Sequence, residues 1–176
     1  MYDTKIPIQS KNQLSKYHVF GLSKSHLLEK FVCFIMKNGE KDKAYKILYK
    51  TLNIIMLTVL QAHKLRTMYS KLTATSIVLQ AINNVKPSLE VRKVRKSGRT
   101  ILIPRIVPTT RQEVLAIRWI IESARQNKRK SRLSFSECLA LELFYAFQKK
   151  GQARQKRDEL HKIAQANRAF LRFRWW

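Results

Sequence analysis

Residues 88–108 read SLEVRKVRKSGRTILIPRIVP, and this stretch interrupts an otherwise helical pattern. β-branched and basic side chains fill residues 89–95 and 100–107, and the segment 96–99 (KSGR) separates the two runs. Such runs around a short glycine-containing segment predict a β-hairpin with a four-residue loop. Pro104 cannot donate to a ladder, so its strand is expected to expose an edge there. Because a two-stranded ribbon is marginally stable by itself in water, we interpret the hairpin as a contact arm that projects from a helical body.

Apolar residues on both sides of this hairpin recur at three- and four-residue steps, which is typical of amphipathic helices. Asn38-Gly39 is expected to close the first helix in a left-handed conformation, and Ser134 and Glu137 have capping-box spacing. The expected helices cover about 25–38, 42–59, 74–84, 110–127, 134–151 and 152–170. The sequence thus predicts a mainly α-helical single domain of about six helices, residues 25–176, with a protruding hairpin arm (about 88–108), a C-terminal helix and tail (about 152–176) and a basic N-terminal tail (1–24).

The charge of the chain is far from balanced. Its 176 residues include 36 Lys and Arg against 11 Asp and Glu, which gives a formal net charge of +25. A compact domain with this charge repels itself, so a polyanionic partner is expected. Between Ser88 and Arg132 there are 13 cations against 3 acids, and from Lys149 onward 9 against 2. Because separate faces carry cations, we favour a partner that wraps around the protein, such as folded RNA.

The sequence predicts no catalytic, metal or cofactor site. It contains no GxSxG, P-loop, HExxH or Gly-rich dinucleotide motif, and its four histidines share no ligand spacing. Cys33 and Cys138 form no CxxC pair, and their apolar neighbours favour core positions. The longest apolar stretch, residues 54–60, is far shorter than a membrane span. The first residues lack the apolar stretch of a secretory signal and the arginine-rich character of an organellar presequence.

The predicted helix 110–127 concentrates arginine on the side opposite its apolar residues. Trp119 lies at the edge of this basic line, where packing at the core margin is favoured over stacking on a nucleotide. Glu122 falls on the line, so an ion pair within the helix is the simplest structural interpretation of this acid. The line consists of Arg111, Arg118, Arg125 and Arg129.

The last predicted helix repeats this arrangement. His161 has no acidic or cysteine partner beside it, so a hydrogen bond to a phosphate or to the helix surface is favoured over metal ligation. The chain then interleaves aromatic rings and arginines over residues 170–176 (FLRFRWW). This pattern suits base stacking combined with phosphate contact, or burial of the rings, and the two interpretations are equally open. The shared face of the helix carries Arg154, Arg157, His161 and Arg168.

Several segments occur in the order and spacing of a known family. They are LEKF at 28–31, MKNGEK at 36–41, NVKP at 84–87, LAIRWI at 115–120, GQAR at 151–154 and ANRAF at 166–170. From about Leu27 to Trp176 the chain resembles protein seven of the small ribosomal subunit, in its bacterial and organellar form. It departs from the family at the hairpin tip, where Ser97 precedes a lone Gly98 in place of two glycines, and over residues 61–72, which match poorly.

The resemblance implies a function without chemistry. Family members bind the 3′ major domain of small-subunit rRNA, nucleate assembly of the subunit head and approach the exit-site tRNA and the mRNA exit path. Neighbouring head and platform proteins are therefore expected partners, and a membrane is not. Residues implied to contact rRNA are Lys37, Arg92, Arg95, Arg111, Arg118, Arg125, Arg154, Lys156, Arg157, His161, Arg168, Arg172 and Arg174. Residues implied on the tRNA and mRNA side of the arm are Lys96, Arg99 and Arg105.

The C-terminal Trp175-Trp176 is similar to the ends of plant-type mitochondrial members. With the absence of a presequence pattern, this resemblance favours the mitochondrial ribosome in the matrix and is consistent with a protein made inside the organelle. The plastid is the alternative. Two other functions also stay open from composition alone: a DNA-binding or nucleoid protein that uses the basic ribbon in a groove, and a peripheral membrane protein whose basic helices lie on anionic lipid.

Overall fold

The computed structural model describes residues 26–61, 73–96 and 98–174, and the predicted tail 1–24, Ser97 and Trp175-Trp176 lie outside the described residues. This part of the chain contains six α-helices and one β-hairpin, as predicted, and also a 3-10 helix. The elements are α2 (His26–Ile35), α3 (Lys41–Gln61), α5 (Ala74–Val85), β1 (Leu89–Lys96), β2 (Arg99–Ile106), α6 (Thr109–Lys130), α7 (Phe135–Phe147), α8 (Gln152–Ala166) and η2 (Arg168–Phe173).

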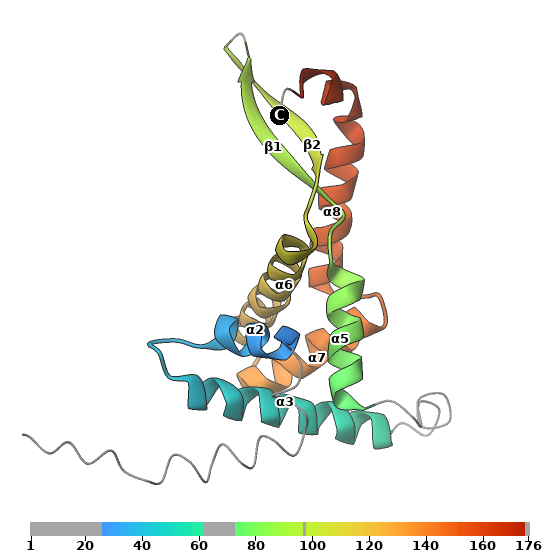
Figure 1. Ribbon diagram of the computed structural model, residues 1–176. Coiled ribbons are helices and arrows are strands. Elements are labelled where there is room, and N and C mark those ends of the chain that lie inside the picture. The colour runs from blue at the N-terminus through green and yellow to red at the C-terminus, as the bar shows by residue number, and fades with distance from the viewer. Residues whose placement is uncertain (1–25, 62–72, 97, 175–176) are drawn as a thin grey trace, which may run out of the picture.

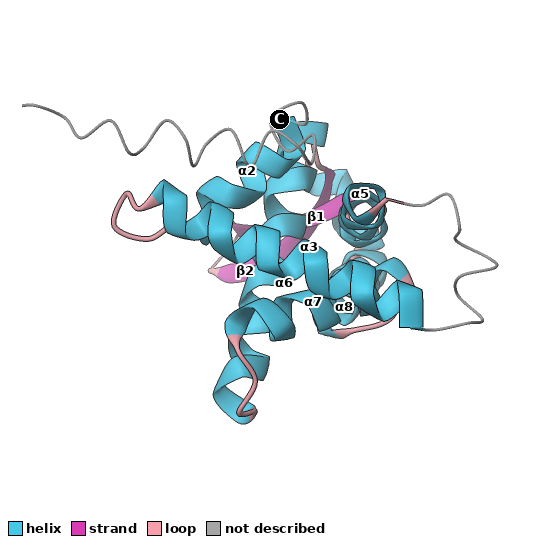
Figure 2. Cartoon of the chain, turned by 90° about the horizontal axis from the view of Figure 1, so that it is seen from below, coloured by secondary structure: helices cyan, strands magenta, loops and turns pink. Residues whose placement is uncertain are grey.

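The helices form a body from which the hairpin extends (Figure 1). Helix α7 packs against α3, α5 and α6, and α2 packs between α3 and α6. Helix α3 lies across the end of the body opposite the hairpin (Figures 1 and 2). The apolar faces of these five helices supply one continuous core, so a single domain results. Its largest fully buried side chains include Leu28, Phe31, Leu48, Leu52, Ile55, Ile77, Ile82, Ile117, Ile120 and Leu139.

Local sequence signals account for the helix ends. The capping box is confirmed: the Ser134 hydroxyl accepts a hydrogen bond from the Glu137 amide (3.3 Å), and the Glu137 carboxylate accepts one from the Ser134 amide (2.8 Å). The first helix was expected to close at Asn38-Gly39, but α2 ends earlier, at Ile35. Asn38 (φ 52°) and Gly39 (φ 75°) do adopt the left-handed conformation, and they turn the chain into α3.

The hairpin connection is shorter than predicted. The antiparallel register pairs Lys96 with Arg99, so two residues join the strands and the predicted four-residue loop is wrong. Gly98 has a φ of 77°, the left-handed conformation that two-residue hairpin turns require. Pro104 lies opposite Val91 in a sheet of only two strands, but its side chain is buried.

Pro104 is buried because the arm is not an isolated ribbon. Helix α8 and η2 pack along the hairpin, and Figure 1 shows them leaving the body side by side with it. The prediction of one helix over 152–170 is wrong at its end. Asn167 ends α8, where its side-chain amide donates to the Ile163 carbonyl (2.8 Å), and the chain continues as the 3-10 helix η2. Helix α8 and η2 thus supply the packing that two strands lack.

The two cysteines differ in environment. Cys138 is buried, as predicted, and lies 3.5 Å from the Ser131 hydroxyl. The prediction of a core position for Cys33 is wrong, because its side chain is exposed. On α2 the residues Phe31 and Val32 face the core, and Cys33 comes one helical step further round, on the solvent side.

Candidate nucleic-acid interface

The line of arginines predicted on residues 110–127 is present on α6. Arg118, Arg125 and Arg129 are exposed, and the opposite face of the helix is buried in the core. The Arg118 guanidinium lies over the ring of Phe34, 5.9 Å from its centre, so α2 supports its position. Trp119 packs against the core margin, as favoured from the sequence. We call Arg118, Arg125 and Arg129 the α6 basic face.

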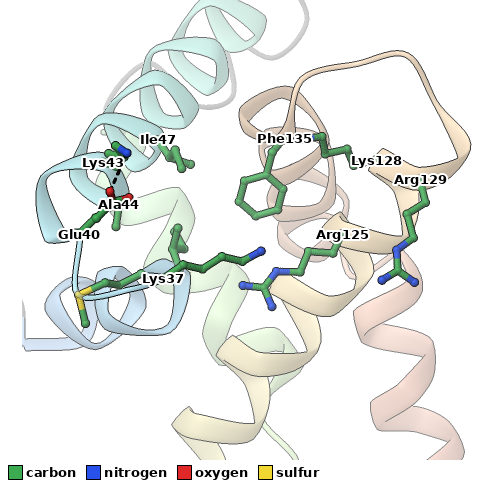
Figure 3. Close-up of a pocket in the computed structure, with 11 residues that line it drawn as sticks. Lys37, Glu40, Lys43, Ala44, Ile47, Arg125, Lys128, Arg129 and Phe135 are labelled. Carbon is green, nitrogen blue, oxygen red and sulfur yellow. Dashed lines mark hydrogen bonds and ion pairs between the residues drawn. The ribbon is translucent and has the colours of Figure 1, made fainter.

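The α6 basic face continues into a cleft between α6, α3 and the turn after α2 (Figure 3). The cleft has a volume of about 410 Å³. Its charged lining residues are Lys37, Glu40, Lys43, Arg125, Lys128 and Arg129. We call these residues, with the apolar side chains of Ile35, Met36, Ala44, Ile47 and Phe135, the basic cleft.

Most cations of the basic cleft have no acidic partner. Glu40 is the one carboxylate in its lining, and it accepts a bond from Lys43 Nζ at 2.7 Å. Within residues 26–61, 73–96 and 98–174, no ion pair involves Lys37, Arg125, Lys128 or Arg129. Two residues of the predicted site, Lys37 and Arg125, thus come together here although they are far apart in the sequence.

Arg111, by contrast, is held by an acid. Its Nε and Nη2 atoms each donate to a carboxylate oxygen of Glu90 at 2.7 Å, and Arg105 Nη2 donates to the same group at 3.2 Å. The bond from Arg111 is the main reason that the pKa of Glu90 lies below its ordinary value, and Glu90 in turn raises the pKa of Arg111. The cluster ties β1 and β2 to the first turn of α6. An rRNA contact by Arg111 stays a prediction, and the structure adds a positioning role.

Two predicted rRNA-binding residues of α8 also bind within the protein. Arg154 Nη1 and Arg157 Nη1 donate to the backbone carbonyl of Asn84, at 2.6 and 3.0 Å. Both arginines also bond to Asp158. Burial by itself would raise the pKa of Asp158, but Arg157 and Arg154 outweigh it, and the pKa lies below its ordinary value. These guanidinium groups therefore satisfy the carbonyl end of α5, where helix termini leave acceptors unpaired.

His161 binds the base of the hairpin. Its Nε2 atom accepts a hydrogen bond from the Ser88 amide at 3.2 Å. Burial and then the charge of Arg157 lower the pKa of His161, which favours the neutral ring that can accept at this nitrogen. The sequence favoured a hydrogen bond over metal ligation, and the bond that forms is to the backbone that leads into β1.

Glu122 does not pair within α6, so that interpretation is wrong. It accepts from Lys156 Nζ of α8 at 3.4 Å, because α6 and α8 pack together. Lys156 therefore lies at the surface in an ion pair with Glu122. Beyond α8, Arg168 and Arg172 of η2 and the following Arg174 are exposed.

The tip of the arm rests on the C-terminal aromatics. Lys96 Nζ lies 3.9 Å from the ring centre of Phe173, and the Arg172 guanidinium lies 4.9 Å from it on η2. Phe170 stacks with Phe173 at 6.2 Å between ring centres. Base stacking and burial of the rings were both open for this segment. Phe170 and Phe173 pack within the protein. The arm itself exposes Arg92, Arg95, Lys96 and Arg99, whereas Arg105 is half-buried against Glu90.

Sequence reasoning missed three polar groups that join the elements. Asn84 donates to the carbonyls of Ala146 and Phe147 at the end of α7, at 3.1 and 2.9 Å. Glu113 binds both Lys30 and Lys86. The buried Glu142 accepts from the Ala153 amide at 2.9 Å, in the first turn of α8. Asn84 lies three residues before Pro87, at the end of a predicted helix, whereas Glu113 and Glu142 lie within helices and no local pattern marks their partners.

The described residues offer little for other chemistry. They contain no group of three His, Cys, Asp or Glu side chains placed to hold a metal ion. None of their helices combines the length and the apolar character that crossing a bilayer requires. What the described residues provide is a helical body with cations on α6 and in the basic cleft that form no ion pair among these residues, and more cations along the arm. Such an arrangement binds phosphate groups of a polyanion.

Comparison with known proteins agrees with this geometry. The small ribosomal subunit protein uS7m of Marchantia polymorpha is 43% identical over 162 residues, 90% of this chain and 65% of that protein. The uS7m of Prototheca wickerhamii is 51% identical over 111 residues, 61% of this chain and 50% of that protein. The chain thus spans between half and two thirds of the length of these two relatives.

Other relatives match over nearly their whole length. The uS7m of Arabidopsis thaliana is 37% identical over 150 residues, which is 85% of this chain and 93% of that protein. The uS7 of Blochmanniella floridana is 39% identical over 152 residues, 86% of this chain and 88% of that protein. A model of the family "Ribosomal protein S7p/S5e" matches residues 5–168. With its helical body, hairpin arm and unpaired cations, the chain belongs to this family of ribosomal proteins, which is not a family of enzymes.

Proposed function

We propose that the protein is a structural constituent of the small ribosomal subunit that binds the 3′ major domain of its rRNA and nucleates assembly of the subunit head. The observation that carries this proposal is the α6 basic face with the adjoining basic cleft, where five cations lack acidic partners in the described chain. Membership of a ribosomal protein family supports RNA as the polyanion, in place of DNA or a lipid surface.

The proposed mechanism is phosphate contact from a rigid frame. Arg118, Arg125 and Arg129 are fixed by the helix that also forms the core, so phosphates of separate RNA strands would be held at set positions. Contacts of this kind position the RNA without reading its bases, and specificity comes from RNA shape. Because these cations neutralise closely spaced phosphates, they stabilise a folded junction that would otherwise repel itself.

The hairpin arm is proposed to approach the exit-site tRNA and the mRNA exit path. It projects from the body, it is braced by α8 and η2, and Lys96 and Arg99 face each other at its tip. A braced arm reaches a flexible ligand at a defined position, which an isolated ribbon would not. The head and platform proteins of the subunit are the proposed neighbours.

The mitochondrial ribosome is the proposed location. Relatives named uS7m from Marchantia polymorpha, Arabidopsis thaliana and Triticum aestivum, at 43%, 37% and 34% identity, support it. A bacterial-type relative, the uS7 of Blochmanniella floridana, has a similar identity of 39%, so the plastid stays the alternative.

The test compares two double variants that remove the same charge. Replacing Arg118 and Arg125 with Gln is expected to weaken binding of a 3′ major-domain rRNA fragment and to lower the slope of log affinity against log salt by about two contacts' worth. The control replaces Lys46 and Lys50, which are exposed on α3, with Gln. Equal losses in both variants would show that net charge, not the α6 basic face, governs binding. Equal affinity of the wild type for duplex DNA would favour a DNA-binding function.

A further inference from the structure

The basic cleft has an apolar floor, which phosphate binding alone does not require. Ile35, Ala44 and Ile47 supply part of this floor from α2 and α3. Phe135, the first residue of α7, is only partly buried, and its ring projects into the cleft between α3 and α6 (Figure 3). An aromatic ring beside cations is the combination that binds the base and the phosphates of a single nucleic-acid strand.

We propose that the basic cleft holds one unpaired nucleotide of RNA, with its base against the ring of Phe135 and its flanking phosphates on Lys37, Arg125 and Arg129. This inference rests on the proposed function and deepens it, because it names the form of RNA that this part of the surface binds. Paired bases are stacked within a helix and cannot reach the ring, so the occupant comes from a loop, a bulge or a junction.

Four cations of the cleft, Lys37, Arg125, Lys128 and Arg129, have no acidic partner in the part of the chain that the structure describes. Figure 3 shows the charged ends of Lys37 and Arg125 pointing toward one another, and no acid of the described chain pairs with either. Lys128 and Arg129 belong to the last turn of α6, where cations also offset the partial negative charge of a helix end. That explanation does not cover Lys37, which lies outside α6, or Arg125, which precedes the last turn. An anion between them relieves the repulsion.

The size of the cleft fits a nucleotide. Its volume of about 410 Å³ lies within the range of about 300–1,000 Å³ found for small-molecule sites. The cleft adjoins the α6 basic face, since the exposed Arg125 and Arg129 belong to both. A strand that follows the α6 arginines can therefore turn one base into the cleft without leaving the cationic surface.

The experiment separates the base contact from the phosphate contacts. Phe135→Leu keeps an apolar side chain for the core but removes the aromatic face, and Arg125→Gln removes one charge. The matched control is Tyr145→Leu, an exposed aromatic residue of the same helix that does not line the cleft. Each full-length variant is first checked by thermal unfolding. Affinity, its salt dependence and the chemical reactivity of unpaired nucleotides are then measured with the 3′ major-domain rRNA fragment.

Phe135→Leu is expected to weaken binding about tenfold without changing the salt slope, and to restore reactivity at one or two unpaired nucleotides. Arg125→Gln is expected to lower the slope by about one phosphate contact. Tyr145→Leu should match the wild type in both. If Phe135→Leu has wild-type affinity and the wild-type protection pattern, the nucleotide site is wrong.

A second arm keeps this inference separate from the proposed function. If the wild type binds the rRNA fragment no better than an unrelated structured RNA of equal length, the proposed function fails. Single-stranded RNA that carries a photoreactive base still tests the cleft. A crosslink to Phe135 from the single strand, and none from a blunt duplex of the same sequence, supports the nucleotide site. Equal crosslinking by both forms, none by either, or crosslinking that an acidic peptide prevents and an unlabelled single-stranded RNA does not, would overturn it.

Discussion

Arg111 of α6 donates two hydrogen bonds of 2.7 Å to Glu90 of β1, one to each carboxylate oxygen. The two residues join the arm to the body at the point where β2 leads into α6. Arg105 of β2 adds a third bond to the same carboxylate, at 3.2 Å. One acid therefore links both strands to the helix that carries the α6 basic face.

Glu90→Gln is expected to loosen the base of the arm, because it removes the charge that two arginines share. The pair is partly exposed, so the expected coupling between Glu90 and Arg111 is small, about 0.2–1 kcal/mol. A double-mutant cycle with Arg111→Gln, measured by chemical denaturation, checks this value. Amide exchange along β1 should rise in either single variant. Additive single effects and unchanged exchange would contradict the positioning role.

The same pair gives a pH dependence. The folded pKa of Glu90 is depressed, mainly by the hydrogen bond from Arg111, so its contribution to stability is present above the ordinary glutamate pKa of 4.5 and is lost as pH falls below it. Glu113, whose pKa is lowered mainly by Lys30, acts in the same direction. The stability difference between wild type and Glu90→Gln is therefore expected to shrink on acidification. A difference that grows as pH falls would have the wrong sign.

Replacing Arg154 and Arg157 with Ala is expected to lower the stability of the protein and to have little effect on the salt dependence of RNA binding. Both side chains donate to the Asn84 carbonyl, and their loss leaves that acceptor unpaired at the end of α5. Hydrogen bonds from charged donors contribute about 1.5–3 kcal/mol each before discounting for solvent. Thermal unfolding measures the loss, and the salt slope of RNA binding measures phosphate contact. If the slope of log affinity against log salt falls by about two phosphate contacts and the unfolding temperature is unchanged, the main role of these residues is to bind RNA and not to support the fold.

Gly151→Ala is expected to destabilise the start of α8. Gly151 has a φ of 92°, and an added Cβ would lie 3.0 Å from Glu142 Oε1 and 3.1 Å from Tyr145 Cβ. Gly39→Ala is the control, since Gly39 has a φ of 75° but no atom within 4 Å of the added Cβ. Each substitution puts a Cβ on backbone with a positive φ, which costs about 1–3 kcal/mol and more at Gly151, whose ψ of 167° lies in a region occupied almost only by glycine. Gly151→Ala alone adds a clash, so it is expected to lower the unfolding temperature further than Gly39→Ala does. Equal unfolding temperatures for the two variants would rule out the clash.

Glu142 should behave oppositely to Glu90 with pH. Burial raises its pKa, so the stability associated with its protonated form is present below the ordinary glutamate pKa and is lost as pH rises through the folded value. The free energy of unfolding of the wild type, relative to that of Glu142→Gln, is therefore expected to fall as pH rises from about 4 to about 8. Denaturant unfolding at several pH values provides the measurement. A constant difference would show that the carboxyl does not titrate differently in the folded state.

Local patterns were sufficient for the elements and for one face of the site. The spacing of Ile117, Ile120 and Arg118 places apolar and basic side chains on opposite sides of any helix, so the α6 basic face could be predicted before its neighbours were known. The capping box at Ser134 and the left-handed turn at Gly39 are likewise local. The ends of some elements were predicted less exactly. Continuing the helical pattern to residue 170 missed the Asn167 side chain, which ends α8, and the glycine-containing segment 96–99 did not show that only two residues join the strands.

The partners of each cation could not be predicted, because they come from distant parts of the chain. Arg111 finds Glu90 across 21 residues, and Arg157 finds the Asn84 carbonyl across 73. A helical wheel places such arginines on a basic face, but it cannot show which of them the fold already uses. The basic cleft has the same origin, since Lys37 and Arg125 meet only when α2 packs against α6.

Sedimentation of an organelle extract through a sucrose gradient, with detection of this chain before and after RNase treatment, tests the central claim most directly. The account predicts that the protein travels with the small ribosomal subunit at moderate salt and moves to the top of the gradient after RNase. A protein that stays at the top in both gradients would contradict it, and the unpaired cations of α6 would then serve a different polyanion.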